Sequence, residues 1–250
     1  MNSKAIKAII AYGQIYREEF LRGVWSEKHL LEDWREALRF FFDKAFYQGR
    51  SDEMSGRVHE AALKVLEPML SQWPQLPENW DREELRRRLQ AKIGKGKVGR
   101  GRDVEMVVSS LEYVSKLPHS NIVKHSVQRI EAGDIGRHFE ELQKAKSEAG
   151  IVQVGPKIAS FYLRDIVSLF EIEDKVSANF QFTLQPIDTW VRKVAFRTGM
   201  VPKKASDRQI GQAIIGLCNK ENCSPLQFNQ RAWYAGARAF DLLMENLATG

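Results

Sequence analysis

The sequence predicts an all-α protein. Apolar residues recur at three- and four-residue intervals along most of the 250 residues, as they do on the buried face of an amphipathic helix. Strand signals are scarce, because sustained apolar–polar alternation and the Asn-Gly dipeptide of tight hairpins are both missing from the sequence. A chain of this length can form one large domain or two closely packed lobes.

Capping residues mark the starts of several expected helices. Ser26, Asp81 and Ser224 each precede an apolar-periodic run, and their side chains can accept a hydrogen bond from the first turn. Pro225 follows Ser224 at the first helical position, which proline favours. After a first helix that begins near Ile6, the sequence predicts helices over about residues 27–48, 54–71, 81–93, 103–116, 120–131, 134–149, 156–171, 186–199, 206–219 and 224–247.

The composition is that of an ordinary globular protein with a basic surface. Hydrophobic residues make up 43% of the chain and charged residues 28%, which is unlike a disordered protein. The formal net charge of +6 favours a polyanionic partner. No apolar run reaches the roughly 18 residues of a membrane span, and no signal-peptide core is present. We therefore expect an intracellular protein, in the cytoplasm or nucleoid, without a membrane partner.

The cysteines and histidines give no indication of a metal site. Cys218 and Cys223 supply two thiols, and two ligands cannot close a tetrahedral site. We therefore expect structural or incidental thiols. The histidines show no metal-ligand spacing and are expected on the surface or in packing: His29, His59, His119, His125 and His138.

The segment 152–165 combines a short hairpin with a helix start. Gly155 gives the backbone freedom and lets a ligand approach without meeting a Cβ, and Pro156 opens the helix. The unpaired amides at such a helix start suit a phosphate, with Lys157 on the same turn. Further along, Pro186-Ile-Asp-Thr189 opens another helix and supplies the carboxylate of Asp188.

These blocks, in this order, resemble the helix-hairpin-helix (HhH-GPD) DNA glycosylase superfamily, which includes endonuclease III and the 8-oxoguanine glycosylases. Val154-Gly-Pro-Lys-Ile-Ala159 is similar to the hairpin pattern L-P-G-V-G-x-K-T-A, and residues 186–189 to the P-V-D-T motif. The resemblance covers roughly residues 38–200. It departs from the pattern at Gln153, where the first hairpin glycine is usual, and at Trp190, where several members have histidine.

The resemblance implies a two-lobed all-α fold. Lobe one would comprise about residues 1–45 with 170–250, and lobe two about residues 46–169. The helix-hairpin-helix motif would span about residues 134–171. The partner would be damaged double-stranded DNA, bound by a monomer.

The resemblance also implies base excision with AP lyase activity. Lys157 falls on the lysine that forms a Schiff base in bifunctional members, and Asp188 on the carboxylate common to the superfamily. An oxidised base is one possible substrate. The iron–sulfur cluster of endonuclease III needs four cysteines and is excluded here, whereas a monovalent cation at the hairpin is compatible. The alternatives are a non-enzymatic helix-hairpin-helix DNA-binding protein, or a glycosylase-derived protein that acts on RNA or recognises damage without cutting.

The turn after the phenylalanine-rich run at 40–46 resembles a further block of the superfamily, L-x-Q-x-T. Gln48 matches the polar residue that enters the duplex where the damaged base has left, and its amide can donate to and accept from an orphaned base. The phenylalanines themselves are expected in the core.

Two basic stretches are candidates for phosphate contacts. Residues 86–102 contain eight basic residues and no acidic one, and form either a solvated loop or a phosphate-binding arm. A second basic band follows Asp188. With the hairpin backbone, the expected DNA-binding residues are Val154, Gly155, Lys95, Lys97, Arg100, Arg102, Arg192 and Lys193, beside Gln48.

The final expected helix carries aromatic residues with two interpretations. Helical spacing of Phe228 and Trp233 fits a packed helix face. A flipped base also needs a stacking wall, and for that role Phe228, Trp233 and Tyr234 are candidates for the base pocket.

Overall fold

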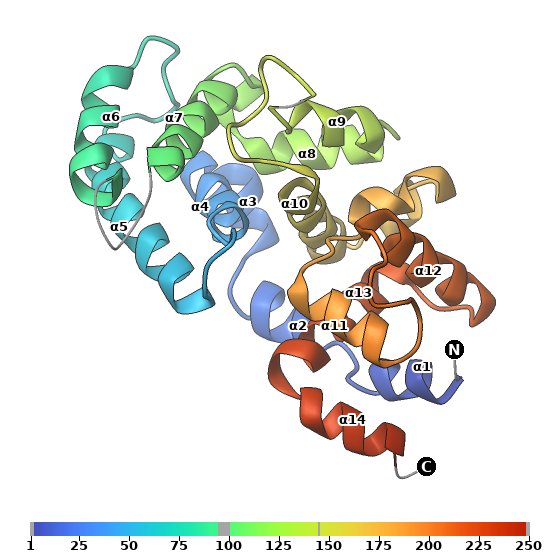
Figure 1. The fold of residues 1–250 in the computed structure, drawn as a ribbon. Coiled ribbons are helices and arrows are strands. Elements are labelled where there is room, and N and C mark those ends of the chain that lie inside the picture. Colours follow the sequence, from blue (N-terminus) through green and yellow to red (C-terminus); the bar gives the residue numbers. More distant parts are fainter. Residues whose placement is uncertain (1–2, 95–100, 145, 249–250) are drawn as a thin grey trace. The chain divides into compact units, whose positions relative to one another are not determined.

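The computed structural model describes residues 3–94, 101–144 and 146–248. Over these residues the chain is helical and contains no strand, apart from one isolated bridge between Gln143 and Ile151 (Figure 1). The predicted all-α class is therefore confirmed. The chain divides into two compact units, here called unit 1 (Met1–Trp25 with Leu163–Gly250) and unit 2 (Ser26–Tyr162).

Unit 1 is built from the two ends of the chain, and α1 packs against α13 and α14. Figure 1 shows both termini in this unit. Its elements are α1 (Ser3–Ile10), α2 (Ile15–Arg17), a π-helical turn (Glu18–Arg22), 3-10 turns (Glu173–Lys175 and Ala178–Leu184), α11 (Thr189–Arg197), α12 (Asp207–Lys220), α13 (Pro225–Arg238) and α14 (Phe240–Ala248).

Unit 2 contains the middle of the chain. Helix α10 (Pro156–Leu169) begins in it and ends in unit 1. The other elements of unit 2 are α3 (Glu27–Glu32), α4 (Trp34–Ala45), α5 (Asp52–Leu70), α6 (Arg82–Leu89), a π-helical turn (Gln90–Gly94), α7 (Gly101–Ser115), a 3-10 turn (Pro118–Ser120), α8 (Ile122–Glu131) and α9 (Ile135–Glu141).

The first boundary between the units follows Trp25, earlier than the expected position near residue 45. It lies there because α3 and α4 pack on each other and on α8. Asn121, which caps α8, donates from its buried amide to the carbonyl of Leu30 at 2.9 Å. The second boundary follows Tyr162, within α10, where about 169 was expected.

The core of unit 2 contains the phenylalanine-rich run. Phe40, Phe41, Phe42 and Phe46 are fully buried, as expected for such side chains. The ring of Phe41 meets that of Tyr162 edge to face, with centroids 5.2 Å apart. This packing fixes the end of α4, and with it the turn that carries Gln48.

Unit 1 has a separate core, formed by α1, α11, α12, α13 and α14. Ile9, Val191, Ile214 and Leu243 are among its buried residues. Cys218 also lies in this core, and burial raises the pKa of its thiol. Both cysteines are free.

Capping residues were predicted correctly, but several helix ends were not. Ser26, Asp81 and Ser224 each accept a hydrogen bond from the first turn of α3, α6 and α13. The helix predicted over 27–48 is interrupted at Asp33, which is extended and caps α4. Likewise, Ala239 separates α13 from α14 inside the expected 224–247 helix.

The helix predicted over 134–149 ends at Glu141. Beyond it the chain turns back, so that the amide of Ile151 donates to the carbonyl of Leu142 at 3.0 Å. A Cβ atom added at Gly150 would overlap the backbone of Gln143. This close approach of two backbone segments is possible only because residue 150 is glycine.

No helix in the described ranges has both the length and the apolar character that crossing a bilayer requires.

We expect Gly150→Ala to destabilise the protein by about 1–3 kcal/mol, because the added methyl group must displace the backbone of Gln143. Gly155→Ala is the matched control. A Cβ at Gly155 meets nothing within 4 Å, so its effect should stay within about 0.5 kcal/mol. Urea unfolding of the two variants measures the difference, and equal midpoints would contradict this account of Gly150.

Candidate functional site

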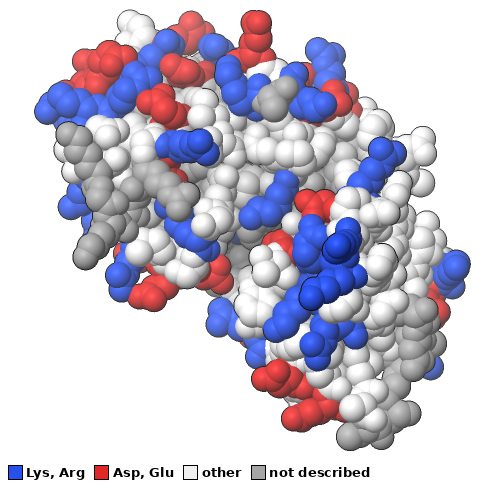
Figure 2. All heavy atoms as spheres, viewed as in Figure 1, with Lys and Arg blue, Asp and Glu red and all other residues white. Residues whose placement is uncertain are grey.

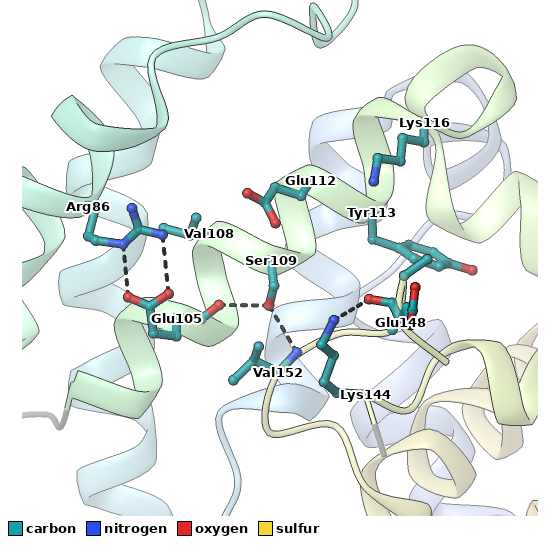
Figure 3. Close-up of a pocket in the computed structure, with 12 residues that line it drawn as sticks. Arg86, Glu105, Val108, Ser109, Glu112, Tyr113, Lys116, Lys144, Glu148 and Val152 are labelled. Carbon is teal, nitrogen blue, oxygen red and sulfur yellow. Dashed lines mark hydrogen bonds and ion pairs between the residues drawn. The ribbon is translucent and has the colours of Figure 1, made fainter. Parts of the chain in front are cut away.

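The connection between α9 and α10 is anchored to α7. The amide of Val152 donates to Oγ of Ser109 at 3.0 Å, and that hydroxyl donates to the carbonyl of Glu105 at 2.7 Å (Figure 3). Lys144 donates to the backbone carbonyl of Glu148 within the same loop. The segment that precedes α10 is therefore held on a rigid helix.

Gln153 adopts a left-handed backbone conformation, with φ of 67°. This is the position where the resemblance expects the first hairpin glycine. Gly155, from which the sequence predicted the backbone freedom, has no positive φ, and the space beside its Cα is open. The turn thus keeps a conformation that glycine favours although a glutamine occupies it.

Lys157 lies on the first turn of α10 and is half-buried. Its Nζ atom donates to the backbone carbonyl of Tyr47 at 3.2 Å. Tyr47 directly precedes Gln48, so the structure brings together two blocks that lie more than 100 residues apart in the sequence. Both belong to unit 2.

Gln48 lies in the bend after α4 and is half-buried. Its Nε2 atom donates to the carbonyl of Ala45 at 2.6 Å and lies 3.5 Å from Sδ of Met106. To enter a duplex, the side-chain amide of Gln48 would have to break its hydrogen bond to Ala45, the last residue of α4.

The hairpin amides and carbonyls are partly engaged. Val154 is buried, and its amide donates to the carbonyl of Ile151 at 3.1 Å. The carbonyl of Gly155 accepts from the amide of Ala159. The oxygen donors available to a monovalent cation are therefore backbone carbonyls that in part already accept hydrogen bonds, and the cation stays a prediction.

The structure describes the first basic stretch in part. Lys95, Lys97 and Arg100 lie outside the described residues. Arg102 is exposed at the start of α7. Earlier in the stretch, Arg86 contacts Glu105 at 2.9 Å.

Asp188 caps α11 instead of lying within its first turn. The helix was expected to begin at Pro186, but Asp188 is extended and Thr189 is the first helical residue. Oδ1 of Asp188 accepts from the amide of Val191 at 2.8 Å. The carboxylate is half-buried at the positive end of α11, which favours its ionised form.

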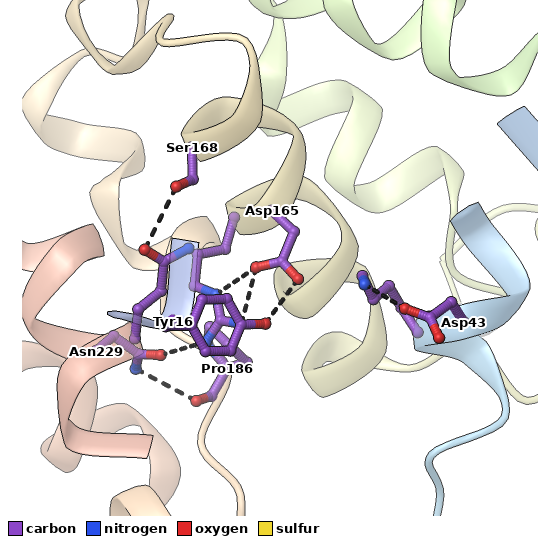
Figure 4. Close-up of polar contacts among 9 residues, drawn as sticks. Tyr16, Asp43, Asp165, Ser168, Pro186 and Asn229 are labelled. Carbon is purple, nitrogen blue, oxygen red and sulfur yellow. Dashed lines mark hydrogen bonds and ion pairs between the residues drawn. The ribbon is translucent and has the colours of Figure 1, made fainter. Parts of the chain in front are cut away.

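A buried polar network in unit 1 supports the segment that carries Asp188 (Figure 4). Arg164 is fully buried, and its Nε and Nη2 atoms contact Oδ1 of Asp165 at 2.9 and 2.8 Å. Nη1 donates to Oδ1 of Asn229 at 2.9 Å, and Nη2 to the hydroxyl of Tyr16 at 2.6 Å. Asn229 in turn donates to the carbonyl of Pro186 at 3.3 Å.

Sequence reasoning missed this network. The available signal was a pair of opposite charges, Arg164 and Asp165, inside an otherwise apolar helical run. Such a pair in a buried stretch requires partners. The partners themselves come from α2 and α13, at sequence distances that no local pattern encodes.

The second basic band lies in unit 1. Figure 2 shows Lys and Arg side chains gathered on one face, over α11 and the segment after it. Arg192 donates to the carbonyl of Ala205 at 2.6 Å and pairs with Asp207. Nζ of Lys193 lies 3.6 Å from the ring centroid of Phe240. These two residues are therefore engaged within unit 1, whereas the neighbouring basic residues Arg197, Lys203, Lys204 and Arg208 are exposed.

The three candidate base-pocket aromatics differ in burial. Phe228 is 1% exposed and belongs to the core of unit 1, which agrees with the interpretation as a packed helix face. Trp233 is half-buried, with its ring edge to face against Tyr16 at 5.4 Å. The hydroxyl of Tyr234 lies 3.5 Å from the carboxylate of Glu19.

Comparison of the chain with protein-family models, with curated proteins and with solved structures gave no match.

We expect Asp165→Asn to destabilise the protein by about 3–5 kcal/mol, because it removes a carboxylate that pairs directly with the buried guanidinium of Arg164. Asp174→Asn provides the matched control, since that carboxylate is exposed and pairs only at the surface. Chemical unfolding followed by circular dichroism compares the two. A wild-type midpoint for Asp165→Asn would mean that the network tolerates the loss of its negative charge.

Proposed function

We propose that this chain is a DNA glycosylase with AP lyase activity, of the helix-hairpin-helix type, which removes a damaged base from double-stranded DNA. The observation that carries the proposal is the bond from Nζ of Lys157 to the carbonyl of Tyr47 at 3.2 Å. It joins the position of the catalytic lysine to the block of the duplex-inserting glutamine, Gln48. The resemblance assigns these roles from sequence order alone, so their proximity in unit 2 is an independent support.

In the proposed reaction, Lys157 acts as a nucleophile in its unprotonated form. Nζ attacks C1′ of the damaged nucleotide, the N-glycosidic bond breaks, and the base leaves with a proton. The sugar ring opens to an imine that joins Nζ to C1′. Removal of a C2′ proton then expels the 3′ phosphate by β-elimination, and water releases the lysine from the product.

Asp188 is proposed to stabilise the positive charge that develops on the sugar as the base departs. Its place at the start of α11 favours the anion. Asn229 holds the Pro186 carbonyl two residues earlier, so the buried Arg164 network fixes the segment that presents the carboxylate. Lys157 and Asp188 belong to different units and are tested separately below.

The alternative is a helix-hairpin-helix protein that binds DNA without cutting it. Two observations favour it: the carboxylate of Asp188 caps a helix, and the amide of Gln48 is bonded to Ala45. Both groups thus have structural roles that need no catalysis. In this case Lys157 would serve as a phosphate contact.

The first test separates these functions through Lys157. A nucleophilic lysine forms an imine with deoxyribose, which borohydride reduces to a stable protein–DNA adduct. On a duplex with a single abasic site, we expect wild-type protein to give this adduct and Lys157→Gln to lose it. Binding should remain, since one lost phosphate contact changes the log–log salt slope by only about one unit.

Lys146→Gln is the matched control, because Lys146 is an exposed lysine of the neighbouring loop. Its trapping rate should equal that of wild type. Equal trapping by Lys157→Gln and wild type would rule out Lys157 as the nucleophile. If the wild-type protein gives no adduct and Lys157→Gln binds DNA more weakly than wild type, the DNA-binding alternative is favoured.

The second test concerns Asp188. Asparagine caps helices about as well as aspartate, so Asp188→Asn should fold, with some loss of stability because the charge of Asp188 also interacts with the buried Arg164. Base excision should fall by roughly 100-fold or more, because the amide carries no charge to offset the sugar cation. Single-turnover excision on a panel of single-lesion duplexes measures this loss, with Asp174→Asn as the control. Full excision by a folded Asp188→Asn protein would contradict the proposed role.

A further inference from the structure

Three side chains with metal-binding atoms converge where α8 packs on α9 in unit 2. His125 lies on α8, and His138 and Glu141 lie one turn apart on α9. One ligand atom from each residue lies within 4.8 Å of the others. The two imidazole rings are nearly perpendicular, with centroids 5.3 Å apart. No sequence pattern indicated this cluster, because 12 residues separate the histidines and the turn between the helices brings them together.

The hydrogen bonds of His138 identify the nitrogen that is available. Its Nε2 atom lies 2.8 Å from Oγ of Ser126. That hydroxyl donates to the carbonyl of Ile122 at 2.7 Å, and the hydroxyl of Tyr162 donates to the same carbonyl at 3.1 Å. The hydroxyls of Ser126 and Tyr162 also lie 2.9 Å apart. In the arrangement where Oγ of Ser126 donates to Ile122, it accepts from Nε2–H, and the neutral ring then carries its lone pair on Nδ1.

Nδ1 of His138 is fully buried and has no hydrogen-bond partner among the described residues. A buried acceptor without a partner is costly. A metal ion at this lone pair would remove that cost. The bond from Nε2–H to Ser126 is also the kind of contact that orients a metal-bound histidine.

We propose that His125, His138 and Glu141 bind a zinc-class divalent metal ion, with water as a fourth ligand. Two imidazoles and a carboxylate form a donor set that Zn²⁺ takes in proteins, in tetrahedral geometry with bonds of about 2.0–2.2 Å. Such bonds place ligand atoms roughly 3.4 Å apart, so the side chains must close in. His125 and Glu141 are half-buried whereas His138 is buried, so the first two side chains have more room for this movement.

The charges around Glu141 are compatible with the ion. Its carboxylate contacts Arg129 at 3.1 Å and Arg137 at 2.9 Å. When Glu141 turns toward the metal, Arg129 keeps Asp134, which it contacts at 2.8 Å. The side chain of Arg137 is 73% exposed, so water can solvate it. The ion would tie α8 to α9, the helix that precedes the hairpin.

The test is calorimetric titration of untagged, chelator-treated protein with Zn²⁺. We expect one equivalent to bind and the melting temperature to rise in parallel, because the ion binds the folded state. His125→Ala and Glu141→Gln should each weaken binding at least about tenfold. Both side chains are half-buried, so the variants should fold, and circular dichroism checks this.

His29→Ala and Cys223→Ser are the matched controls, because they remove potential zinc ligands outside the cluster. Both should bind Zn²⁺ as wild type does. The absorption spectrum of the Co²⁺-loaded protein provides a second readout, since its bands report the coordination geometry. Absence of stoichiometric binding in wild type, or wild-type affinity in both His125→Ala and Glu141→Gln, would overturn the proposal. Neither result depends on glycosylase activity.

Discussion

The buried guanidinium of Arg164 is the constraint on which the candidate site in unit 1 depends. A charge without solvent is tolerated only when it is paired and its donors are satisfied. Asp165 supplies the charge, while Tyr16 and Asn229 accept two further bonds. Tyr16 also donates to Asp165 at 2.8 Å. The requirement to satisfy one cation thus brings together α2, α10 and α13, and through Asn229 it extends to the segment before Asp188.

In unit 2, a second buried network of hydrogen bonds likewise joins separate helices. The Ile122 carbonyl accepts from Ser126 and Tyr162, and Oγ of Ser126 lies 2.8 Å from Nε2 of His138. These contacts join α8, α9 and the middle of α10 inside an apolar core. Burial lowers the pKa of His138 to about 3, aided by His125 and Arg129, so the ring stays neutral at physiological pH. Lys157 therefore lies on the first turn of a helix whose neighbours are fixed by directional bonds as well as by packing.

The sequence predicts local features well and long-range ones poorly. Helix class and the capping roles of Ser26, Asp81 and Ser224 follow from short patterns, and the structure has them. The early end of α9 depends on the contact of Gly150 with Gln143, which only the folded chain shows. The capping role of Asp188 was missed because proline at 186 suggested an earlier helix start. In the candidate site, motif order pointed to Lys157 and Gln48, whereas the partners of Arg164 and His138 come from distant segments.

Gln153 shows that a residue other than glycine can adopt the left-handed backbone conformation of this turn. Its left-handed backbone requires a conformation that glycine adopts at the lowest cost, yet other residues reach it when the surrounding contacts compensate. A sequence pattern that demands glycine here would reject such a chain, although its backbone has a positive φ at this position. Glutamine also adds an amide at the tip of the hairpin, where glycine has none. Turn definitions based on dihedral angles would detect hairpins of this kind across wide sequence divergence.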